Sequence, residues 1–285
     1  MGDIESQRAS VTTTDGVTIS YIRAGSGPDL LFIPGWSQTA AQWRKQLVEF
    51  SQNYRVTAVD MRGHGESGKP NYGYRIARLA ADIHDIINQL DLRDVAVIAH
   101  SMGCCIMWSY WDLFSHDRIA KLILVDQPAL LTADPTWEEG IAGNLGAIFT
   151  PTSSFEYSST MRSSNGAAAS AALVAGMKTP GMTDEDFSWI MKQNLKMPRE
   201  HAATLLIDHA VADWRDVLPR ITVPTLVIGG SASLIPTSGI EWIASQIPGA
   251  RLRIFSESEA GSHFLFWENA SGFNATVYDF LKQQV

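Results

Sequence analysis

The chain has 285 residues, 45% of them hydrophobic and 18% charged, a composition typical of a folded globular protein rather than a disordered or fibrous one. This length allows one large α/β domain or two small ones, with a sizeable core. The formal net charge of −8 argues against a general nucleic-acid-binding or anionic-membrane surface.

The ends and the cysteines add to this picture. The first ten residues are polar with mixed charge, and no apolar run approaches the roughly 20 residues of a membrane span. Cys104 and Cys105 are neighbours, so we expect them to pack rather than to cross-link, which fits a reducing compartment. We therefore expect a soluble, cytoplasmic protein that binds a small-molecule substrate but no nucleic acid or membrane, as a monomer or homodimer.

The first half of the chain alternates apolar runs with helical patterns. Residues 10–21 alternate around Asp15-Gly16, which predicts a β-hairpin. Short apolar runs predict buried strands at 30–33, 55–59, 95–99 and 119–125. Helical spacing of apolar residues predicts helices at 40–50 and 76–90. Strands that alternate with helices predict an α/β protein with a mainly parallel sheet and helices on both faces.

The pattern changes at Ala129. From there to Trp214 the sequence has helical stretches separated by turns and no convincing strand. The apolar run 223–228 resumes the sheet, and a helix, a strand and a last helix are predicted at 240–246, 251–255 and 273–282. We therefore predict an α/β core in residues 1–128 and 215–285, and a helical lid across one edge of the sheet in residues 129–214.

A strand–turn–helix pattern in residues 95–107 marks a candidate nucleophile. The predicted strand ends at Ala99, and Ser101 stands at the apex of a sharp turn before an apolar helix. The G-x-S-x-G nucleophile elbow has this form, because small flanking residues allow a strained turn that exposes the serine hydroxyl. Ala99 replaces the first glycine here, and Gly103 supplies the second. Ser101 is the predicted nucleophile, provided that a base removes its proton.

Further motifs accompany the elbow: Pro34-Gly35-Trp36 after a predicted strand, the glycine-rich loop 60–68, and His263 in the run 261–269. With these motifs in this order, the chain resembles the α/β-hydrolase superfamily over residues 11–281, apart from the lid. Within the superfamily it is most similar to the esterase-like branch called non-haem haloperoxidases. The resemblance implies the α/β-hydrolase fold. It also implies an enzyme that uses no metal and no organic cofactor.

The resemblance assigns His263 as the general base and acid, held at the same sheet edge as Ser101. His64 and His100 belong to the loop and elbow motifs, and we expect both to support the site through hydrogen bonds. An isolated histidine is otherwise more often structural or solvated. The match to the family's histidine position therefore carries the assignment of His263.

The acid of the triad is the least regular part of the pattern. In most of the superfamily it follows the strand that corresponds to 223–228, but this chain has Ser233 about where the carboxylate is expected. The fold can also supply an acid after the strand that follows the elbow, which here is Asp126. We predict that Asp126 orients His263 and stabilises its imidazolium form. An ordinary strand-end aspartate is the competing interpretation, with Glu257 and Glu259 as alternative acids.

The oxyanion hole is predicted to consist of the backbone N–H groups of Trp36 and Met102. Pro34 departs from the histidine that hydrolases of this branch usually have. Aromatic and sulfur side chains indicate an apolar pocket for a fairly large substrate, such as an aromatic one. The candidate substrate-binding residues are Trp36, Met102, Trp137, Phe155 and Trp189. Aromatic lid residues can equally form the core of the lid.

Three functions fit these residues. The leading hypothesis is a serine hydrolase for an ester or lactone, acting through Ser101, His263 and Asp126. The second is a cofactor-independent dioxygenase of the type that opens 3-hydroxy-4-quinolone rings. Those enzymes share Pro-Gly-Trp, the His-Ser-x-Gly elbow and the position of the acid, and their His–Asp dyad deprotonates the substrate without a serine nucleophile. The third is a ligand receptor on the same fold that retains the triad without using it.

Overall fold

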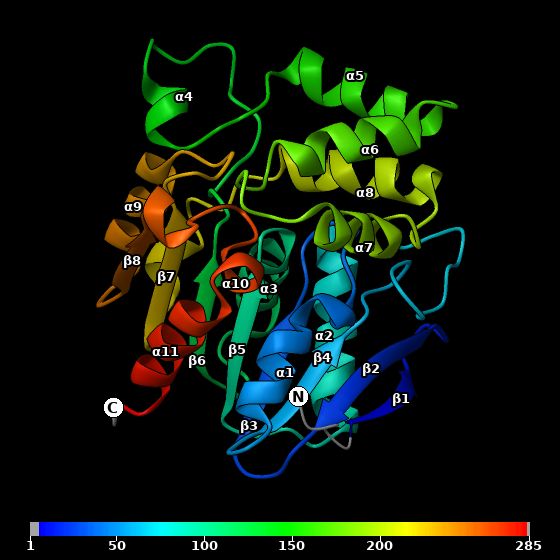
Figure 1. Cartoon of the computed structure of the whole chain (residues 1–285), viewed down its shortest axis with the longest axis vertical. Coiled ribbons are helices and arrows are strands. Elements are labelled where there is room, and N and C mark those ends of the chain that lie inside the picture. Colours follow the sequence, from blue (N-terminus) through cyan, green and yellow to red (C-terminus); the bar gives the residue numbers. More distant parts are fainter. Residues whose placement is uncertain (1–5, 284–285) are drawn as a thin grey trace.

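The central element of the computed structural model, which describes residues 6–283, is an eight-stranded sheet in the order β1-β2-β4-β3-β5-β6-β7-β8 (Figure 1). The strands are β1 Ser6–Thr12, β2 Thr18–Ala24, β3 Asp29–Ile33, β4 Arg55–Val59, β5 Val95–His100, β6 Ile119–Val125, β7 Thr225–Gly230 and β8 Arg251–Phe255. The β1–β2 and β2–β4 pairs are antiparallel and the others parallel. The predicted hairpin and mainly parallel sheet are thus confirmed.

Two hydrophobic cores cover the two faces of the sheet. Side chains alternate across a strand, so Leu31 and Ile33 of β3 lie in one core, and Leu30 and Phe32 in the other. The first core packs against α2 Ile76–Gln89, α3 Met102–Phe114 and α9 Thr237–Gln246. The second packs against α1 Arg44–Phe50 and α11 Ala270–Leu281. The central strands are therefore buried on both sides, as their continuous apolar runs predict.

The segment between β6 and β7 carries five helices within the described residues. We call residues 129–214 the helical insertion, and its helices are α4 Ile141–Asn144, α5 Pro151–Arg162, α6 Gly166–Ala175, α7 Asp184–Asn194 and α8 Arg199–Val211. In Figure 1, α5, α6, α7 and α8 lie together above the sheet, and α4 lies apart from them, next to α9. The strand interaction in this segment is a single bridge between Thr132 and Phe149.

Several predicted elements have shifted boundaries. The helix predicted at 40–50 begins with a 3₁₀ turn, η1 Ala40–Trp43, before α1. β7 starts at Thr225 rather than at Val223, because Pro224 has no N–H to donate to a neighbouring strand. The remaining short helices are η2 Leu218–Arg220, η3 Glu257–Glu259 and α10 Leu265–Glu268.

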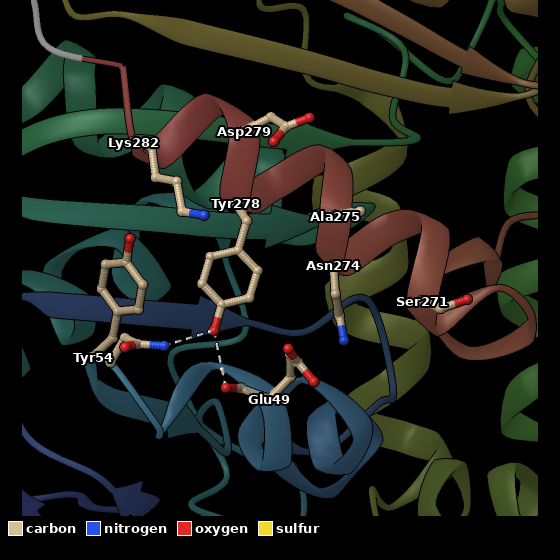
Figure 2. A pocket seen from close by; sticks show the side chains of 9 residues that line it. Glu49, Tyr54, Ser271, Asn274, Ala275, Tyr278, Asp279 and Lys282 are labelled. Atoms are coloured by element: carbon tan, nitrogen blue, oxygen red, sulfur yellow. Dashed lines mark hydrogen bonds between the residues drawn. The ribbon is translucent and has the colours of Figure 1, made fainter.

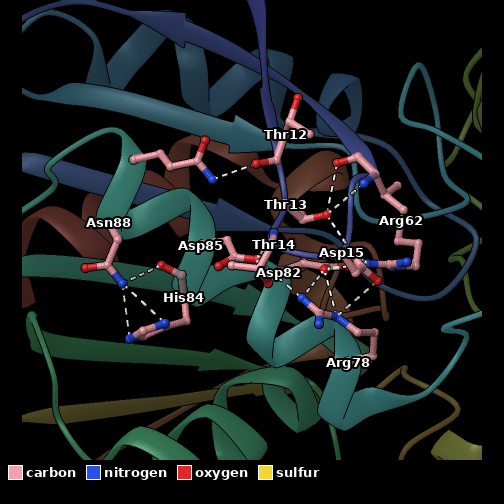
Figure 3. Close-up of polar contacts among 12 residues, drawn as sticks. Thr12, Thr13, Thr14, Asp15, Arg62, Arg78, Asp82, His84, Asp85 and Asn88 are labelled. Carbon is pink, nitrogen blue, oxygen red and sulfur yellow. Dashed lines mark hydrogen bonds and ion pairs between the residues drawn. The ribbon is translucent and has the colours of Figure 1, made fainter.

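A buried ion-pair network fixes the glycine-rich loop that follows β4. The fully buried Arg62 guanidinium binds Asp82 of α2 through two nitrogens, at 2.7 and 2.8 Å, and also Asp15 of the β1–β2 turn at 2.8 Å. Figure 3 shows these side chains converging, together with Arg78. The loop is thereby tied to the hairpin and to α2. Between residues 6 and 283, the helices are all too short or too polar to cross a lipid bilayer.

Candidate active site

Ser101 lies in a strained turn between β5 and α3. Its φ of 52° and ψ of −126° fall in a region that non-glycine residues rarely adopt. The Ser101 N–H donates to the carbonyl of Val125 at 2.8 Å, which ties the turn to the end of neighbouring β6. The sequence prediction of a strand, a turn at Ser101 and a helix is therefore confirmed in its local geometry.

The loop after β3 packs directly against this turn, and a glycine on each side permits the approach. A methyl group on Gly103 would lie 2.8 Å from the carbonyl oxygen of Ile33. On the other side, a methyl group on Gly35 would lie 3.1 Å from both His100 Nδ1 and Ser101 Cβ. The two segments can therefore be this close only because these positions lack side chains.

His64 holds the loop after β3 in place. Its Nδ1–H donates to the carbonyl of Arg62 at 2.8 Å, and its Nε2 accepts the N–H of Ser37 at 3.0 Å. Burial lowers the pKa of His64 to about 4, so the ring is neutral and can accept at Nε2. As expected from the sequence, His64 thus supports the site rather than reacting. Ser37 itself has a φ of 57°, which turns the chain directly after Trp36.

The predicted oxyanion-hole donors belong to the two segments that meet at this contact. Trp36 belongs to the loop after β3, and Met102 is the first residue of α3. Within residues 6–283, neither backbone N–H has a hydrogen-bond acceptor. The Trp36 indole is anchored separately, because its Nε1–H donates to the carbonyl of Ala202 in α8 at 2.9 Å. In the described chain, both backbone N–H groups thus remain unused as hydrogen-bond donors.

Asp126 follows β6 directly and contacts His263. The two residues form a buried pair, with His263 Nδ1 2.6 Å from Asp126 Oδ2. Asp126 has a φ of 54°, and its N–H donates to the carbonyl of Ile228 in β7 at 2.8 Å. The same Oδ2 atom accepts a hydrogen bond from the Ser233 hydroxyl at 2.5 Å. Since a carboxylate can only accept, His263 carries its proton on Nδ1 and leaves Nε2 available as a base.

The loop that carries His263 is fixed by contacts with its surroundings. The His263 N–H donates to the carbonyl of Met177 in the helical insertion at 3.1 Å. The His263 carbonyl accepts from His100 Nε2 at 2.9 Å. Burial holds the pKa of His100 well below its usual value, so this ring is neutral and supports the loop, as predicted. Glu268 adds a further link, because it accepts from Ser262 and from Thr179 of the insertion.

The alternative acids do not contact His263. Glu259 accepts hydrogen bonds from the backbone and hydroxyl of Ser256, both at 2.9 Å, and pairs with Arg253. Glu257 is exposed in η3. Of the carboxylates considered from the sequence, Asp126 is the one that the structure brings to His263.

Two small adjoining cavities meet at Ser101. Both are lined by Trp36, Ser101, Leu173, Met177 and His263. Cavity A also contacts Gly35, Gln38, His100, Val174, Asn194 and Phe264. Cavity B also contacts Gln127, Leu131, Ile148, Phe149, Leu206, His209 and Ile235. Their volumes of about 30 and 40 Å³ are room for a few water molecules at most, so a larger substrate requires side chains of the insertion to move.

Four of the five predicted substrate-binding side chains lie elsewhere. Trp137 and Phe155 line a separate surface hollow, and Phe155 is 58% exposed. Trp189 stacks on Trp267 with ring centroids 4.8 Å apart. The Met102 side chain is fully buried in the core beneath the elbow. These aromatic and sulfur side chains are core or surface residues of the fold, and of the five only Trp36 lines the cavities.

Two polar residues of the insertion that were not predicted from the sequence do line the cavities. Asn194, in cavity A, is 1% exposed, and His209, in cavity B, is 4% exposed. In the described chain, Asn194 Nδ2 and His209 Nδ1 are buried without a hydrogen-bond partner. Burial, and secondarily the charge of His263, lowers the pKa of His209 to about 3, so its ring is neutral. The sequence does carry one signal, because His209 lies four residues after Leu205 and three after Leu206 in an apolar helix, which indicates burial.

A larger hollow lies on the surface between α1 and α11, away from Ser101. Figure 2 shows Tyr54 and Tyr278 at this groove, with Glu49 and Lys282 nearby. The Tyr278 hydroxyl donates to the carbonyl of Glu49 at 3.0 Å, a contact that joins the two helices. The groove has no nucleophile–base pair, so its size does not make it the reaction site. In the described part of the chain, no cluster of three or more histidine, cysteine, aspartate or glutamate side chains is arranged to hold a metal ion.

Comparisons with known proteins identify the family to which the chain belongs. Residues 28–270 match the family model described as the α/β hydrolase fold. The chain belongs to this family. It is 29% identical to a putative non-heme chloroperoxidase from Synechocystis sp., over 93% of this chain and 95% of that protein. It is also 29% identical to a non-heme haloperoxidase from Rhodococcus erythropolis, over 95% and 98% of the two chains. The resemblance to the haloperoxidase and esterase branch is thus confirmed.

Solved structures show the same fold. A bromoperoxidase from Bacillus anthracis superposes with a TM-score of 0.89 at 21% identity, covering 97% of this chain and 100% of that one. An esterase from Exiguobacterium antarcticum gives a TM-score of 0.88 at 24% identity, covering 96% and 99%. The predicted α/β-hydrolase fold is therefore confirmed.

Proposed function

We propose that the protein is a serine hydrolase that cleaves an ester or lactone of a fairly apolar small molecule. Ser101 is the nucleophile, His263 the general base and acid, and Asp126 the carboxylate that orients His263. The observation that carries this proposal is the buried pair of His263 and Asp126, whose Nδ1 and Oδ2 atoms are 2.6 Å apart. His263 lines both cavities together with Ser101, which lies in its strained turn.

The proposed reaction runs in two stages. His263 Nε2 takes the Ser101 proton as Oγ attacks the substrate carbonyl carbon, and the tetrahedral oxyanion is bound by the N–H groups of Trp36 and Met102. The intermediate collapses, and His263 returns the proton to the leaving alkoxide, which stays attached to the acyl group if the substrate is a lactone. His263 then deprotonates a water molecule that attacks the acyl-enzyme, and Ser101 is released with its proton. Two such donors each stabilise the oxyanion by a few kcal/mol.

The walls of the cavities support an apolar substrate. Cavity B in particular is lined by aliphatic and aromatic side chains around Ser101. Two proteins with solved structures of this fold are an enol-lactonase from Burkholderia xenovorans and Est816, described as an N-acyl homoserine lactone degrading enzyme. Their identities of 22% carry only the fold to this chain. They are precedents for lactone chemistry on it.

Cofactor-independent dioxygenation of a 3-hydroxy-4-quinolone-type substrate is the second candidate. One observation favours it: in the described residues, His263 forms a hydrogen bond with Asp126 but none with the Ser101 hydroxyl. A His–Asp dyad that abstracts a substrate proton needs the His263–Asp126 hydrogen bond but not a hydrogen bond to the serine. The geometry of enzymes without substrate is often loose at the nucleophile, so this observation ranks below the position of Ser101 in the elbow.

The test is to assay wild type and Ser101→Ala on a p-nitrophenyl ester and on a 3-hydroxy-4-quinolone, with oxygen uptake recorded. We expect wild type to cleave the ester, and Ser101→Ala to lose at least about 10³-fold in kcat. Oxygen uptake that largely survives the substitution would replace the hydrolase by the dioxygenase. Failure of a fluorophosphonate to label Ser101, with no turnover in either assay but tight ligand binding, would point to a receptor.

A further inference from the structure

The guanidinium of Arg199 holds Asn194 in place. Its Oδ1 accepts a hydrogen bond from Arg199 Nη1 at 3.2 Å, and its backbone carbonyl accepts from Nη2 at 2.7 Å. Arg199 can only donate, so the contact fixes which end of the amide faces it. The oxygen points to Arg199, and the NH₂ group is left without an acceptor among the described residues.

The charge of Arg199 is not neutralised by a carboxylate. Within residues 6–283 it forms no salt bridge, and its guanidinium instead donates to Ser37, Ser170 and the chain around Asn194. Burial lowers its pKa to about 10, which leaves it protonated at neutral pH. A cation on the oxygen side of an amide withdraws electron density, so the Asn194 NH₂ becomes a stronger donor.

That donor is unused in the structure. Asn194 Nδ2 is buried and lacks an acceptor among the described residues, while Asn194 lines cavity A together with Ser101 and His263. A buried donor without a partner is costly, and a ligand oxygen that accepts from it recovers this cost on binding. Cavity B, which shares Ser101, has mostly aliphatic and aromatic walls, with Gln127 and His209 among its polar residues. The unpartnered Nδ1 of the neutral His209 can be a donor or an acceptor depending on the tautomer, whereas the Asn194 NH₂ group, fixed by Arg199, can only donate.

We propose that Asn194 is a specificity-determining residue that donates a hydrogen bond to an acceptor oxygen of the substrate in cavity A. The substrate is then an ester or lactone with a carbonyl or ether oxygen on one side of the reacting carbonyl and an apolar group on the other. The assignment of the substrate as an ester or lactone rests on the proposed hydrolase function, whereas the hydrogen bond from Asn194 does not. A site built to hydrogen-bond one oxygen discriminates strongly against an analogue that lacks it.

Binding to the Ser101→Ala protein tests the contact without turnover. The probes are ethyl hexanoate and its 3-oxo, 4-oxo and 5-oxo derivatives, with Kd measured by calorimetry. We expect at least one oxo ester to bind about tenfold more tightly than ethyl hexanoate. Asn194→Leu in the same background should abolish this preference, and so should Asn194→Asp, which keeps the shape and the Arg199 contact but replaces the donor by an acceptor.

Lys192→Leu is the matched control, because Lys192 is exposed on the same helix and should leave the preference intact. Near-UV circular dichroism of each variant checks that the fold is retained. A preference that survives both Asn194 substitutions would overturn the proposal, as would equal or absent binding of all four esters to the Ser101→Ala protein. Wild-type hydrolysis of the esters is scored separately. Preference without turnover would contradict the hydrolase function alone, and turnover without preference would contradict the Asn194 contact alone.

Discussion

Ser233 and His263 donate to the same oxygen atom, Asp126 Oδ2, at 2.5 and 2.6 Å. Ser233 lies in the loop after β7, where most members of the superfamily are expected to carry the acid, and Asp126 lies after the neighbouring β6. The residues that follow the two neighbouring strands thus meet at one carboxylate oxygen, to which the histidine ring also donates. Ser233 thus donates to the Asp126 carboxylate from the position at which most members of the superfamily carry the acid itself.

Ser233→Ala should therefore change the properties of His263. Without the hydroxyl, the negative charge on Asp126 is less delocalised onto a donor and stabilises the imidazolium more strongly. We expect kcat to fall about tenfold and the acidic limb of the pH–rate profile to move to higher pH by up to about one unit. Ser231→Ala, at an exposed position of the same loop, is the control. A profile that does not move would show that Ser233 has only a structural role.

The position of the acid should also be transferable. Asp126→Asn leaves His263 with the wrong tautomer preference, and we expect about a 10⁴-fold loss of kcat with the fold retained. Adding Ser233→Asp returns a carboxylate within reach of the same ring, so the double variant should regain at least about tenfold. The kcat of each variant on a p-nitrophenyl ester measures the loss and the recovery. If the double variant is no more active than Asp126→Asn, an acid after β7 cannot replace the acid after β6.

Gly35→Ala tests the contact between the loop after β3 and the elbow. The added methyl group would lie 3.1 Å from His100 Nδ1 and from Ser101 Cβ, so one segment must shift. We expect a loss of about 1–3 kcal/mol in the free energy of unfolding, measured in urea, and a lower kcat. Gly143→Ala is a suitable control, because nothing lies within 4 Å of its added methyl group. Equal effects of the two substitutions would contradict the close approach.

Stability should fall in mild acid because of buried histidines. The pKa of His64 is lowered to about 4 and that of His209 to about 3, against 6.5 in an unfolded chain. Below pH 6.5 the unfolded chain binds protons that the folded chain cannot, so the free energy of unfolding decreases as pH falls from 6.5 to about 4. Over its full range, His64 contributes about 3 kcal/mol and His209 about 5 kcal/mol.

Urea unfolding at pH 7.5 and at pH 5 measures this decrease. His209→Leu removes one of the groups, and we expect the decrease between the two pH values to be about 2 kcal/mol smaller than in wild type. Replacing His116, an exposed residue, by glutamine should leave the decrease unchanged. An undiminished decrease in His209→Leu would mean that this ring is already protonated in the folded protein at pH 5.

The sheet could be predicted closely because its central strands are buried on both faces. β4 and β6 have the predicted limits, and β3 and β5 differ by one residue. Such strands are continuous apolar runs, and turns or polar residues bound them. Ser101 was also predictable, since a serine at a sharp turn between an apolar strand and an apolar helix is typical of the nucleophile elbow.

The pocket could not be predicted in the same way. Trp189 and Asn194 are both on α7, yet the tryptophan packs on Trp267 and the asparagine lines cavity A. Hydrophobicity indicates that a residue is buried, but not which buried surface it joins. That depends on how the insertion packs over the sheet, which long-range contacts decide. Aromatic content therefore pointed to Trp137, Phe155 and Trp189, and polar wall residues gave no comparable pattern.

The backbone contact at Met177 links access to reactivity. Met177 lines both cavities, and its carbonyl accepts the N–H of His263. Any displacement of Met177 that widens the entrance also loosens the segment that carries the histidine. For the proposed hydrolase, we therefore expect reactivity to be lowest when Met177 is displaced. With the proposed nucleophile Ser101, such a coupling would favour substrates that leave Met177 in its contact with His263.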